Sequence, residues 1–79
     1  MEYLNEIKAL VASVLEINEE DLGVDVDMSE IGEWDSMRYL IILSKLEEIY
    51  GVKFPQEDVF DLVSVRALSD EINKLKERR

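Results

Sequence analysis

The chain has 79 residues, enough for one small domain that buries about 60 % of its unfolded surface and too few for a deep substrate pocket as well. Nine Lys and Arg residues against nineteen Asp and Glu residues give a net charge of −10, which repels nucleic acid and anionic membranes and favours a protein partner with a basic patch. His and Cys are absent, which excludes Ser-His-Asp and Cys-His catalysis, imidazole or thiolate metal sites and disulfide bonds, so a stand-alone enzyme is not expected.

We expect residues 1–79 to form a single, monomeric domain in the cytoplasm. The N-terminal part of the chain carries regularly spaced charges without a continuous apolar core, which is not the pattern of a signal peptide or a membrane-spanning segment. The lack of Cys agrees with a reducing compartment.

Apolar residues near the start of the chain recur at the spacing of a helix that buries one face, which predicts a first helix over about residues 3–16. From Ile17 to Asp35 this spacing is lost, and acidic residues alternate with apolar ones. Such a connection is long for a small domain, and its apolar residues indicate that it packs against the helices. The apolar residues are Leu4, Ile7, Val11, Val14 and Leu15 in the helix, and Leu22, Val24, Val26, Met28 and Ile31 in the connection.

A second helix is expected from Ser36 to about Tyr50, because Gly51 suits the left-handed conformation that commonly ends a helix. Pro55 then favours a short helical piece at about 56–61, since proline fits the first turn of a helix.

Ser64 is suited to cap a last helix, whose C-terminal end would contain the basic run from Lys74 to Arg79. Three long helices and a short one, with a long loop between the first two, predict an all-α fold, a small four-helix bundle. The apolar stripe of the last helix consists of Val65, Leu68, Ile72 and Leu75.

The second helix is apolar on two faces. One face is apolar along its whole length and is expected to form the core. The other begins with Met37, Leu40 and Ile41 and becomes polar at Ser44 and Glu48, so we interpret it as an exposed docking surface. The alternative is that the long loop folds back and covers it. The core face consists of Tyr39, Ile42, Leu43, Leu46 and Tyr50.

Ser36 lies where the acidic loop gives way to this helix. Asp35 has the short acceptor side chain preferred at a helix N-cap, which leaves Ser36 in the first turn with its Oγ free to face solvent. A phosphate on that oxygen would lie favourably beside the unpaired N–H groups and the positive end of the helix dipole. The alternative reading is that Asp-Ser is simply a good helix start.

Taken together, the length, the order of the helices, the acidic balance and the Asp35-Ser36-Met37 junction resemble an acyl or peptidyl carrier protein. In that family a serine that follows aspartate and precedes a hydrophobic residue opens the second helix and carries a 4′-phosphopantetheine arm. The segment from Glu47 to Pro55 resembles the end of that helix and its following turn, and the segment from Ser64 to Leu68 resembles the opening of the last helix.

The resemblance implies that a phosphopantetheinyl transferase moves the arm from coenzyme A onto Ser36 and that the terminal thiol then holds an acyl or aminoacyl intermediate as a thioester. Asp35 would orient the junction and contact the transferase. Loading and downstream biosynthetic enzymes would supply the chemistry, and we expect no metal and no catalytic residue in this chain. The expected partner-binding residues are Met37, Leu40, Ile41, Arg38, Glu47 and Glu48.

Two features differ from the carriers of fatty acid synthesis. Arg38 and Lys45 lie in a helix that is usually acidic in those carriers, and Trp34 before the junction resembles carriers of specialised pathways. We therefore expect a role in a specialised biosynthetic pathway. Glu47 and Glu48 agree with the acidic helix of the fatty acid carriers, so fatty acid synthesis stays an alternative. The cargo stays undetermined among fatty acyl, polyketide, aminoacyl and peptidyl groups, because partner enzymes choose it.

The sequence leaves two alternatives to a carrier. An unmodified acidic helical adaptor would bind a protein through Met37, Leu40 and Ile41 without a prosthetic group. A calcium site is suggested by Asp25, Asp27 and Ser29, which resemble the start of an EF-hand loop. The match fails because Glu30 stands where the glycine is needed and Ser36 where the closing glutamate is needed. We interpret it as a solvated acidic loop.

We expect Trp34 to anchor the loop through its ring, not to stack on a substrate. Lys45 is more than two helical turns from Ser36, too far to act as its base.

Overall fold

The computed structural model describes residues 3–77, with the side chain of residue 58 left outside that description; the last two residues of the expected basic run, Arg78 and Arg79, also lie outside it. Three α-helices and three short 3₁₀ helices occur in this stretch, which contains no strand. In chain order the elements are α1 (Leu4–Leu15), η1 (Glu19–Asp21), η2 (Met28–Glu30), α2 (Ser36–Tyr50), η3 (Gln56–Asp61) and α3 (Val65–Glu77).

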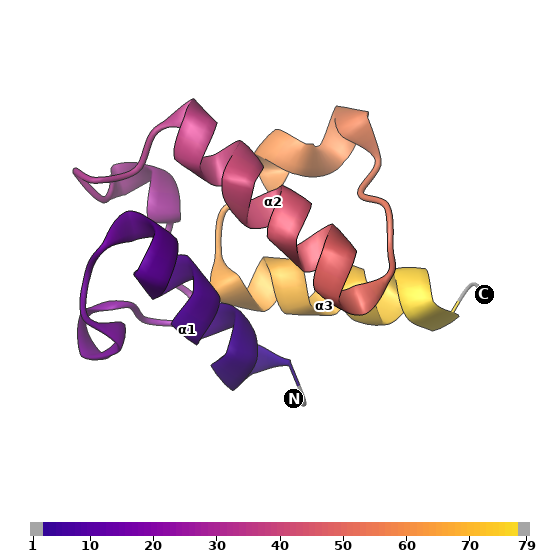
Figure 1. Ribbon diagram of the computed structural model, residues 1–79, viewed down its shortest axis with the longest axis horizontal. Helices are drawn as coiled ribbons and strands as arrows, with labels where there is room; N and C mark the ends of the chain where they lie inside the picture. The colour runs from indigo at the N-terminus through magenta and orange to yellow at the C-terminus, as the bar shows by residue number, and fades with distance from the viewer. Residues whose placement is uncertain (1–2, 78–79) are drawn as a thin grey trace.

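The α1 helix packs against both α2 and α3, and η3 lies beside α2 on the side away from α1 (Figure 1). All three helices and the long connection contribute to one core of buried side chains, as the apolar stripes predict. None of the described helices is long and apolar enough to cross a membrane. The core contains Ile7, Val11, Ala12, Leu15, Leu22, Met28, Tyr39, Ile42, Leu43, Leu46, Val52, Phe54, Val65, Leu68 and Ile72.

The predicted ends of α1 and α2 are confirmed to within one residue. The α2 helix begins at Ser36 and ends at Tyr50, and Gly51 adopts the left-handed conformation with φ 67°. Ser64 Oγ accepts a hydrogen bond from the Ala67 N–H at 3.0 Å, as expected of a cap. The all-helical fold class is therefore confirmed.

The expected short fourth helix is found at 56–61, but it is the 3₁₀ helix η3 and not an α-helix. Its first turn follows Pro55, as predicted. A segment of six residues is about two turns of this tighter helix, which occurs mainly in such short pieces. The described part of the chain is thus a three-helix fold whose additional short element is η3.

The long connection is packed down, as its apolar residues indicated. Leu22 and Met28 are fully buried, although Val26 is exposed. The Met28 N–H donates to the Val63 carbonyl at 2.7 Å, and the Arg66 N–H donates to the Val24 carbonyl at 2.9 Å. These bonds fasten the connection to the start of α3 and so fix the direction in which the chain approaches Ser36.

One residue of the predicted core face is placed differently. Tyr39, Ile42, Leu43 and Leu46 are buried, whereas Tyr50 is only half-buried. Its hydroxyl donates to Glu6 at 2.6 Å, and a phenol with a partner at the surface has no need of full burial.

Candidate functional site

The start of α2 leaves open hydrogen-bond donors beside an exposed hydroxyl. Asp35 is the N-cap, and its Oδ1 accepts a hydrogen bond from the Arg38 N–H at 2.7 Å. The Tyr39 N–H donates to the Asp35 carbonyl, which is the first bond of the helical ladder. Ser36 and Met37 therefore keep N–H groups without intrahelical acceptors. Ser36 is exposed, as predicted, and is the first residue of the helix.

This geometry suits a phosphate ester on Ser36. The oxygen is accessible, and the helix N-terminus supplies N–H donors and partial positive charge where a phosphate would lie. In addition, the second carboxylate oxygen of the exposed Asp35 is not used in capping and remains open to a partner. The junction therefore accommodates an anionic substituent without rearrangement of the helix start.

Trp34 anchors the loop just before this junction. Its half-buried ring packs on the core, and the ring centroids of Trp34 and Tyr39 lie 5.7 Å apart. Phe60 of η3 also lies against this tyrosine, with ring centroids 5.9 Å apart. The predicted anchoring role of Trp34 is confirmed, and the two ring contacts connect the loop, α2 and η3.

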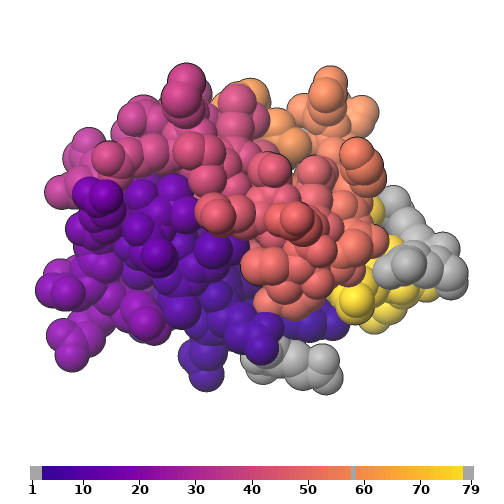
Figure 2. All heavy atoms as spheres, viewed as in Figure 1, coloured from indigo at the N-terminus to yellow at the C-terminus, as the bar shows by residue number. Residues whose placement is uncertain are grey.

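Apolar side chains on the outer face of α2 are left uncovered. Met37 is 72 % exposed, Leu40 52 % and Ile41 42 %. The residues of α2 form a continuous band across one face of the molecule (Figure 2), and the long connection does not cover these three side chains. Ser44 and Glu48 on the same stripe are exposed as well. The stripe is therefore accessible in the way that the docking interpretation requires.

Arg38 and Lys45, the two cations of α2, have different surroundings. The Arg38 guanidinium reaches inward and donates to the carbonyls of Leu15 at 3.2 Å and Val14 at 3.4 Å. These carbonyls belong to the last turn of α1, where no intrahelical donor remains. Lys45 is exposed and points to solvent. Of these two cations, Lys45 alone therefore presents its charge freely to solvent.

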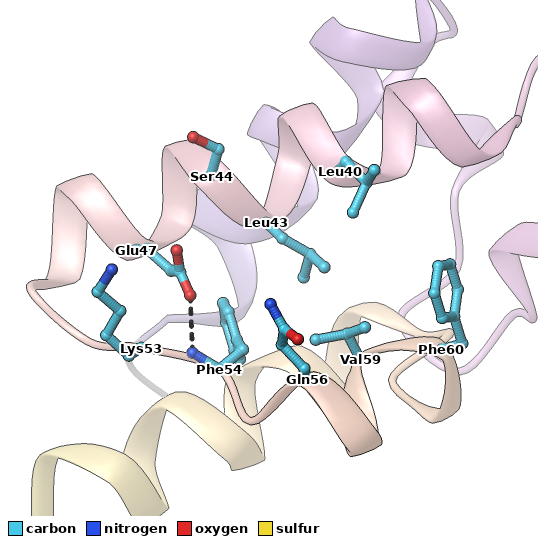
Figure 3. Close-up of a pocket in the computed structure, with 9 residues that line it drawn as sticks. All are labelled: Leu40, Leu43, Ser44, Glu47, Lys53, Phe54, Gln56, Val59 and Phe60. Carbon is cyan, nitrogen blue, oxygen red and sulfur yellow. Dashed lines mark hydrogen bonds between the residues drawn. The ribbon is translucent and has the colours of Figure 1, made fainter.

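A groove of about 550 Å³ runs between α2 and η3 (Figure 3). Leu40 and Phe60 face each other at the end nearer to the start of α2, whereas Glu47 and Lys53 lie at the opposite end (Figure 3). The groove thus passes from an apolar to a charged end. The remaining lining residues are Leu43, Ser44, Phe54, Gln56 and Val59.

The sequence did not reveal this groove. Val59 and Phe60 were not singled out, and Tyr39 was assigned to the core without a polar role. The only local signal was an aromatic side chain in a short helical piece that has no apolar stripe of its own. The pairing of Phe60 with Leu40 depends on how η3 folds back on α2, which a spacing pattern does not contain.

Glu47 and Glu48 are neighbours with different surroundings. The Glu47 Oε2 accepts a hydrogen bond from the Phe54 N–H at 2.7 Å, so this carboxylate holds the turn between α2 and η3 (Figure 3). Glu48 is exposed on the outer stripe.

Two carboxylates of the acidic loop are bonded within the fold. Asp25 pairs with the Arg66 guanidinium at 2.6 Å, and Asp27 accepts hydrogen bonds from both the N–H and the hydroxyl of Ser29. In the part of the chain that the structure describes, no group of three potential metal ligands comes together.

Tyr39 is a fully buried residue one turn after Ser36, and its hydroxyl has partners within the fold. It donates to the carbonyls of Val59 and Leu62, each at 2.5 Å. Burial raises the pKa of the Tyr39 phenol well above its ordinary value, and the negative charge of Asp61 raises it further. The phenol is therefore a permanent hydrogen-bond donor near neutral pH.

Comparison with known proteins gives two matches. A family model described as "Phosphopantetheine attachment site" matches residues 5–72. An acyl carrier protein of Thermosynechococcus vestitus (strain NIES-2133 / IAM M-273 / BP-1) is 32 % identical over 72 residues, which cover 91 % of this chain and 89 % of that protein. Both matches include the junction at Asp35 and Ser36 and most of the helical elements.

Proposed function

Because the chain belongs to the acyl carrier protein family of phosphopantetheine-attachment proteins, we propose that Ser36 Oγ is the atom that carries the prosthetic group. The chain is a non-catalytic carrier that serves other enzymes, and its covalent cofactor is 4′-phosphopantetheine. When attached, this group supplies a terminal thiol that holds an acyl or aminoacyl intermediate as a thioester. The observation that carries the proposal is the exposed Ser36 hydroxyl at the capped start of α2.

The surroundings of the other serines favour this choice. Ser29 Oγ donates to Asp27, Ser64 Oγ accepts the capping bond of α3, and Ser69 is fully buried. Ser13 and Ser44 are exposed, but they lie within α1 and α2 and not at a capped helix start. Ser36 combines exposure, a preceding capping aspartate and open N–H groups. We assign Asp35 a second role toward the transferase, since one of its carboxylate oxygens stays available after capping.

The test is intact-protein mass after the purified apo chain is incubated with coenzyme A and a broad-specificity phosphopantetheinyl transferase. We expect one phosphopantetheine on the wild type and none on Ser36→Ala. Ser44→Ala is the matched control, since it removes an exposed serine from the same helix and should still be modified. Failure of the wild type under conditions that modify a known carrier would overturn the proposal and favour the unmodified adaptor.

We assign the outer stripe of α2 to the docking of partner enzymes. Met37, Leu40 and Ile41 supply exposed apolar area beside Ser36, and Glu48 supplies a charge at the far end. The charged groups of Arg38 and Glu47 are bonded within the fold. We therefore propose that these two residues stabilise the helix that carries the docking stripe and do not contact the partner through their charges. The partner should present an apolar patch with a basic rim.

The docking assignment is tested with two isoleucines of the same helix. Ile41→Glu should slow loading by the native partner enzyme about tenfold, because a charge would enter the apolar contact. Ile49→Glu is the control, since Ile49 is 62 % exposed but lies about two turns farther from Ser36. Equal loading of both variants would show that the outer stripe of α2 does not contact the partner enzyme.

We propose a specialised pathway because Lys45 presents a positive charge on α2 and Trp34 precedes the junction. A malonyl transacylase of fatty acid synthesis should load the modified chain about tenfold more slowly than a carrier of fatty acid synthesis. Equal rates would instead support the fatty acid pathway.

A further inference from the structure

Met37 places a thioether at the surface of the molecule, next to Ser36 in the chain. Its side chain is 72 % exposed in the first turn of α2, whereas Met28 is fully buried. The chain has three methionines and no cysteine, and the third methionine, Met1, lies outside the described residues. Within residues 3–77, Met37 is therefore the methionine that a dissolved reagent reaches in the folded chain.

Met37 also belongs to the outer stripe of α2. Leu40 and Ile41 follow it at the spacing that places side chains on the same side of a helix. Met37 is the most exposed of the three and the nearest to Ser36 in the chain. An unbranched thioether adapts its shape to different contact surfaces. A change in the polarity of this one side chain therefore alters the contact offered to any enzyme that closes over Ser36.

A peroxide converts such a thioether into a sulfoxide. A lone pair of the methionine sulfur attacks one oxygen of hydrogen peroxide, and the S–O bond forms as the O–O bond breaks. The departing hydroxide takes the proton from the transferred oxygen and becomes water, so the sulfur loses the two electrons that the peroxide gains. The product is polar and chiral, and methionine sulfoxide reductases convert it back to the thioether. Their reductant is a dithiol, which leaves as a disulfide together with one water.

Met28 is protected from this reaction by its place in the core. It is fully buried, and its N–H donates to the Val63 carbonyl at 2.7 Å. A peroxide reaches this sulfur only when the connection opens away from α3, which is a local unfolding event. The two methionines therefore provide an internal comparison between an exposed and a protected thioether in one chain.

Resting on the proposed function, we infer that Met37 is a reversible oxidation site: its conversion to the sulfoxide slows the enzymes that act at Ser36, and its reduction restores their rate. A sulfoxide oxygen needs hydrogen-bond partners, and an apolar contact that buries it supplies none. Met37 is not part of the hydrophobic core, so the fold keeps its stability in both forms.

The first test is the oxidation rate of each methionine in the unmodified chain. The apo chain is treated with hydrogen peroxide, and peptide mass mapping measures the sulfoxide at each position. In the folded chain Met37 should react at least about tenfold faster than Met28, and in urea the two should react at similar rates. Equal rates in the folded chain would overturn the inference.

The second test is the modification of Ser36 by coenzyme A and a broad-specificity phosphopantetheinyl transferase. After the peroxide is removed, the oxidised wild type should be modified about tenfold more slowly than the untreated wild type. Methionine sulfoxide reductases for both epimers should restore the rate. An oxidised chain that is modified at the untreated rate would overturn the inference, as would a loss that persists after mapping shows Met37 reduced.

Two substitutions at position 37 separate oxidation of this sulfur from oxidation elsewhere. Met37→Leu removes the sulfur, so its rate of modification, whatever its starting value, should be the same before and after peroxide. Met37→Gln places a polar side chain at the same position and should be modified slowly without any peroxide. If peroxide slows Met37→Leu as much as the wild type, another residue causes the effect and the inference is overturned.

The design separates this inference from the proposed function. If the transferase modifies a known carrier but not the untreated wild type, the proposed function fails, while mapping of the apo chain still decides whether Met37 is the selectively oxidised methionine. The melting temperature of the oxidised chain should equal that of the untreated chain, since Met37 lies outside the core. A lower melting temperature together with slower modification would mean that oxidation acts through the fold, and would overturn the inference.

Discussion

Asp35 offers a capping oxygen and a negative charge, and these two properties can be separated by substitution. Its Oδ1 accepts from the Arg38 N–H at 2.7 Å. Asp35→Ala should lower the free energy of unfolding by about 1 kcal/mol, because an N–H of the first turn loses its acceptor. Asp35→Asn should leave stability nearly unchanged, since asparagine caps about as well as aspartate. Urea denaturation of the two variants measures both effects.

The same pair of variants tests the role of Asp35 toward the transferase. Asp35→Asn keeps the cap and removes the charge, so slower modification of this variant at unchanged stability would assign the effect to the carboxylate. If Asp35→Asn is modified as fast as the wild type, Asp35 serves only as the cap. Equal loss of stability in the alanine and asparagine variants would contradict the capping account.

Tyr39 makes stability depend on alkaline pH. Its pKa in the folded chain is raised by burial and by Asp61, so the folded state keeps a proton that the unfolded state loses above about pH 10. The stability from the neutral phenol is therefore complete below pH 10 and falls as the pH rises above it, by about 1.4 kcal/mol for each pH unit. Urea unfolding of the wild type at pH 9 and pH 11 measures this loss.

Tyr39→Phe is the reference for that experiment. The other titratable groups are common to both proteins, so their effects cancel in the difference between the two. The variant should start less stable and lose less stability between the two pH values. Parallel pH profiles would show that the Tyr39 phenol ionises as easily in the folded chain as in the unfolded one.

At the scale of elements, two helices end in the left-handed conformation with different residues. Gly51 follows α2 with φ 67°, and Glu16 follows α1 with φ 61°. A side chain in this conformation costs about 1 kcal/mol, so Gly51→Ala should destabilise the fold by roughly that amount. Glu16→Gly should raise the melting temperature, because glycine relieves the strain and removes a negative charge from the negative end of α1.

The two causes at position 16 are distinguished by Glu16→Gln, which removes the charge and keeps the side chain. Most of the gain in Glu16→Gly should be missing from Glu16→Gln if the backbone conformation dominates. A melting temperature that is lower in Glu16→Gly than in the wild type would mean that the greater freedom of glycine in the unfolded chain outweighs the relief of strain.

The ends of the α-helices could be predicted because their signals are local. Asp35, Gly51 and Ser64 each act on backbone groups within four residues, and the structure confirms all three caps. The exposure of Ser36 followed from the same reasoning. The apolar spacing of α2 likewise separated the buried Tyr39 face from the exposed Ile41 face.

What the sequence did not predict depends on contacts between distant segments. The Arg38 side chain points inward because it donates to carbonyls of α1, more than twenty residues earlier in the chain. The spacing of residues within α2 therefore could not predict that this guanidinium is bonded within the fold. The groove forms only when η3 folds back to place Phe60 opposite Leu40. The 3₁₀ form of η3 was also missed, because Pro55 favours a helical first turn without specifying which kind.

The whole molecule carries far more negative than positive charge, with nineteen acidic and nine basic residues and a net charge of −10. Within residues 3–77, ion pairs join Arg66 to Asp25 at 2.6 Å and Lys74 to Glu71 at 3.7 Å. Most of the carboxylates in the described part of the chain are therefore without a close cation. Their mutual repulsion acts over distances that added salt screens.

We therefore expect sodium chloride between about 0.02 M and 0.3 M to raise the melting temperature, since the Debye length shrinks and the repulsion weakens. Each kcal/mol of relieved repulsion corresponds to about 4–8 °C in a domain of this size. Glu19→Gln combined with Glu20→Gln, at two exposed positions of η1, should melt higher at low salt and gain less from added salt. A melting temperature that stays flat or falls with salt would mean that the acidic surface does not strain the fold, and that its charge serves only to select a partner.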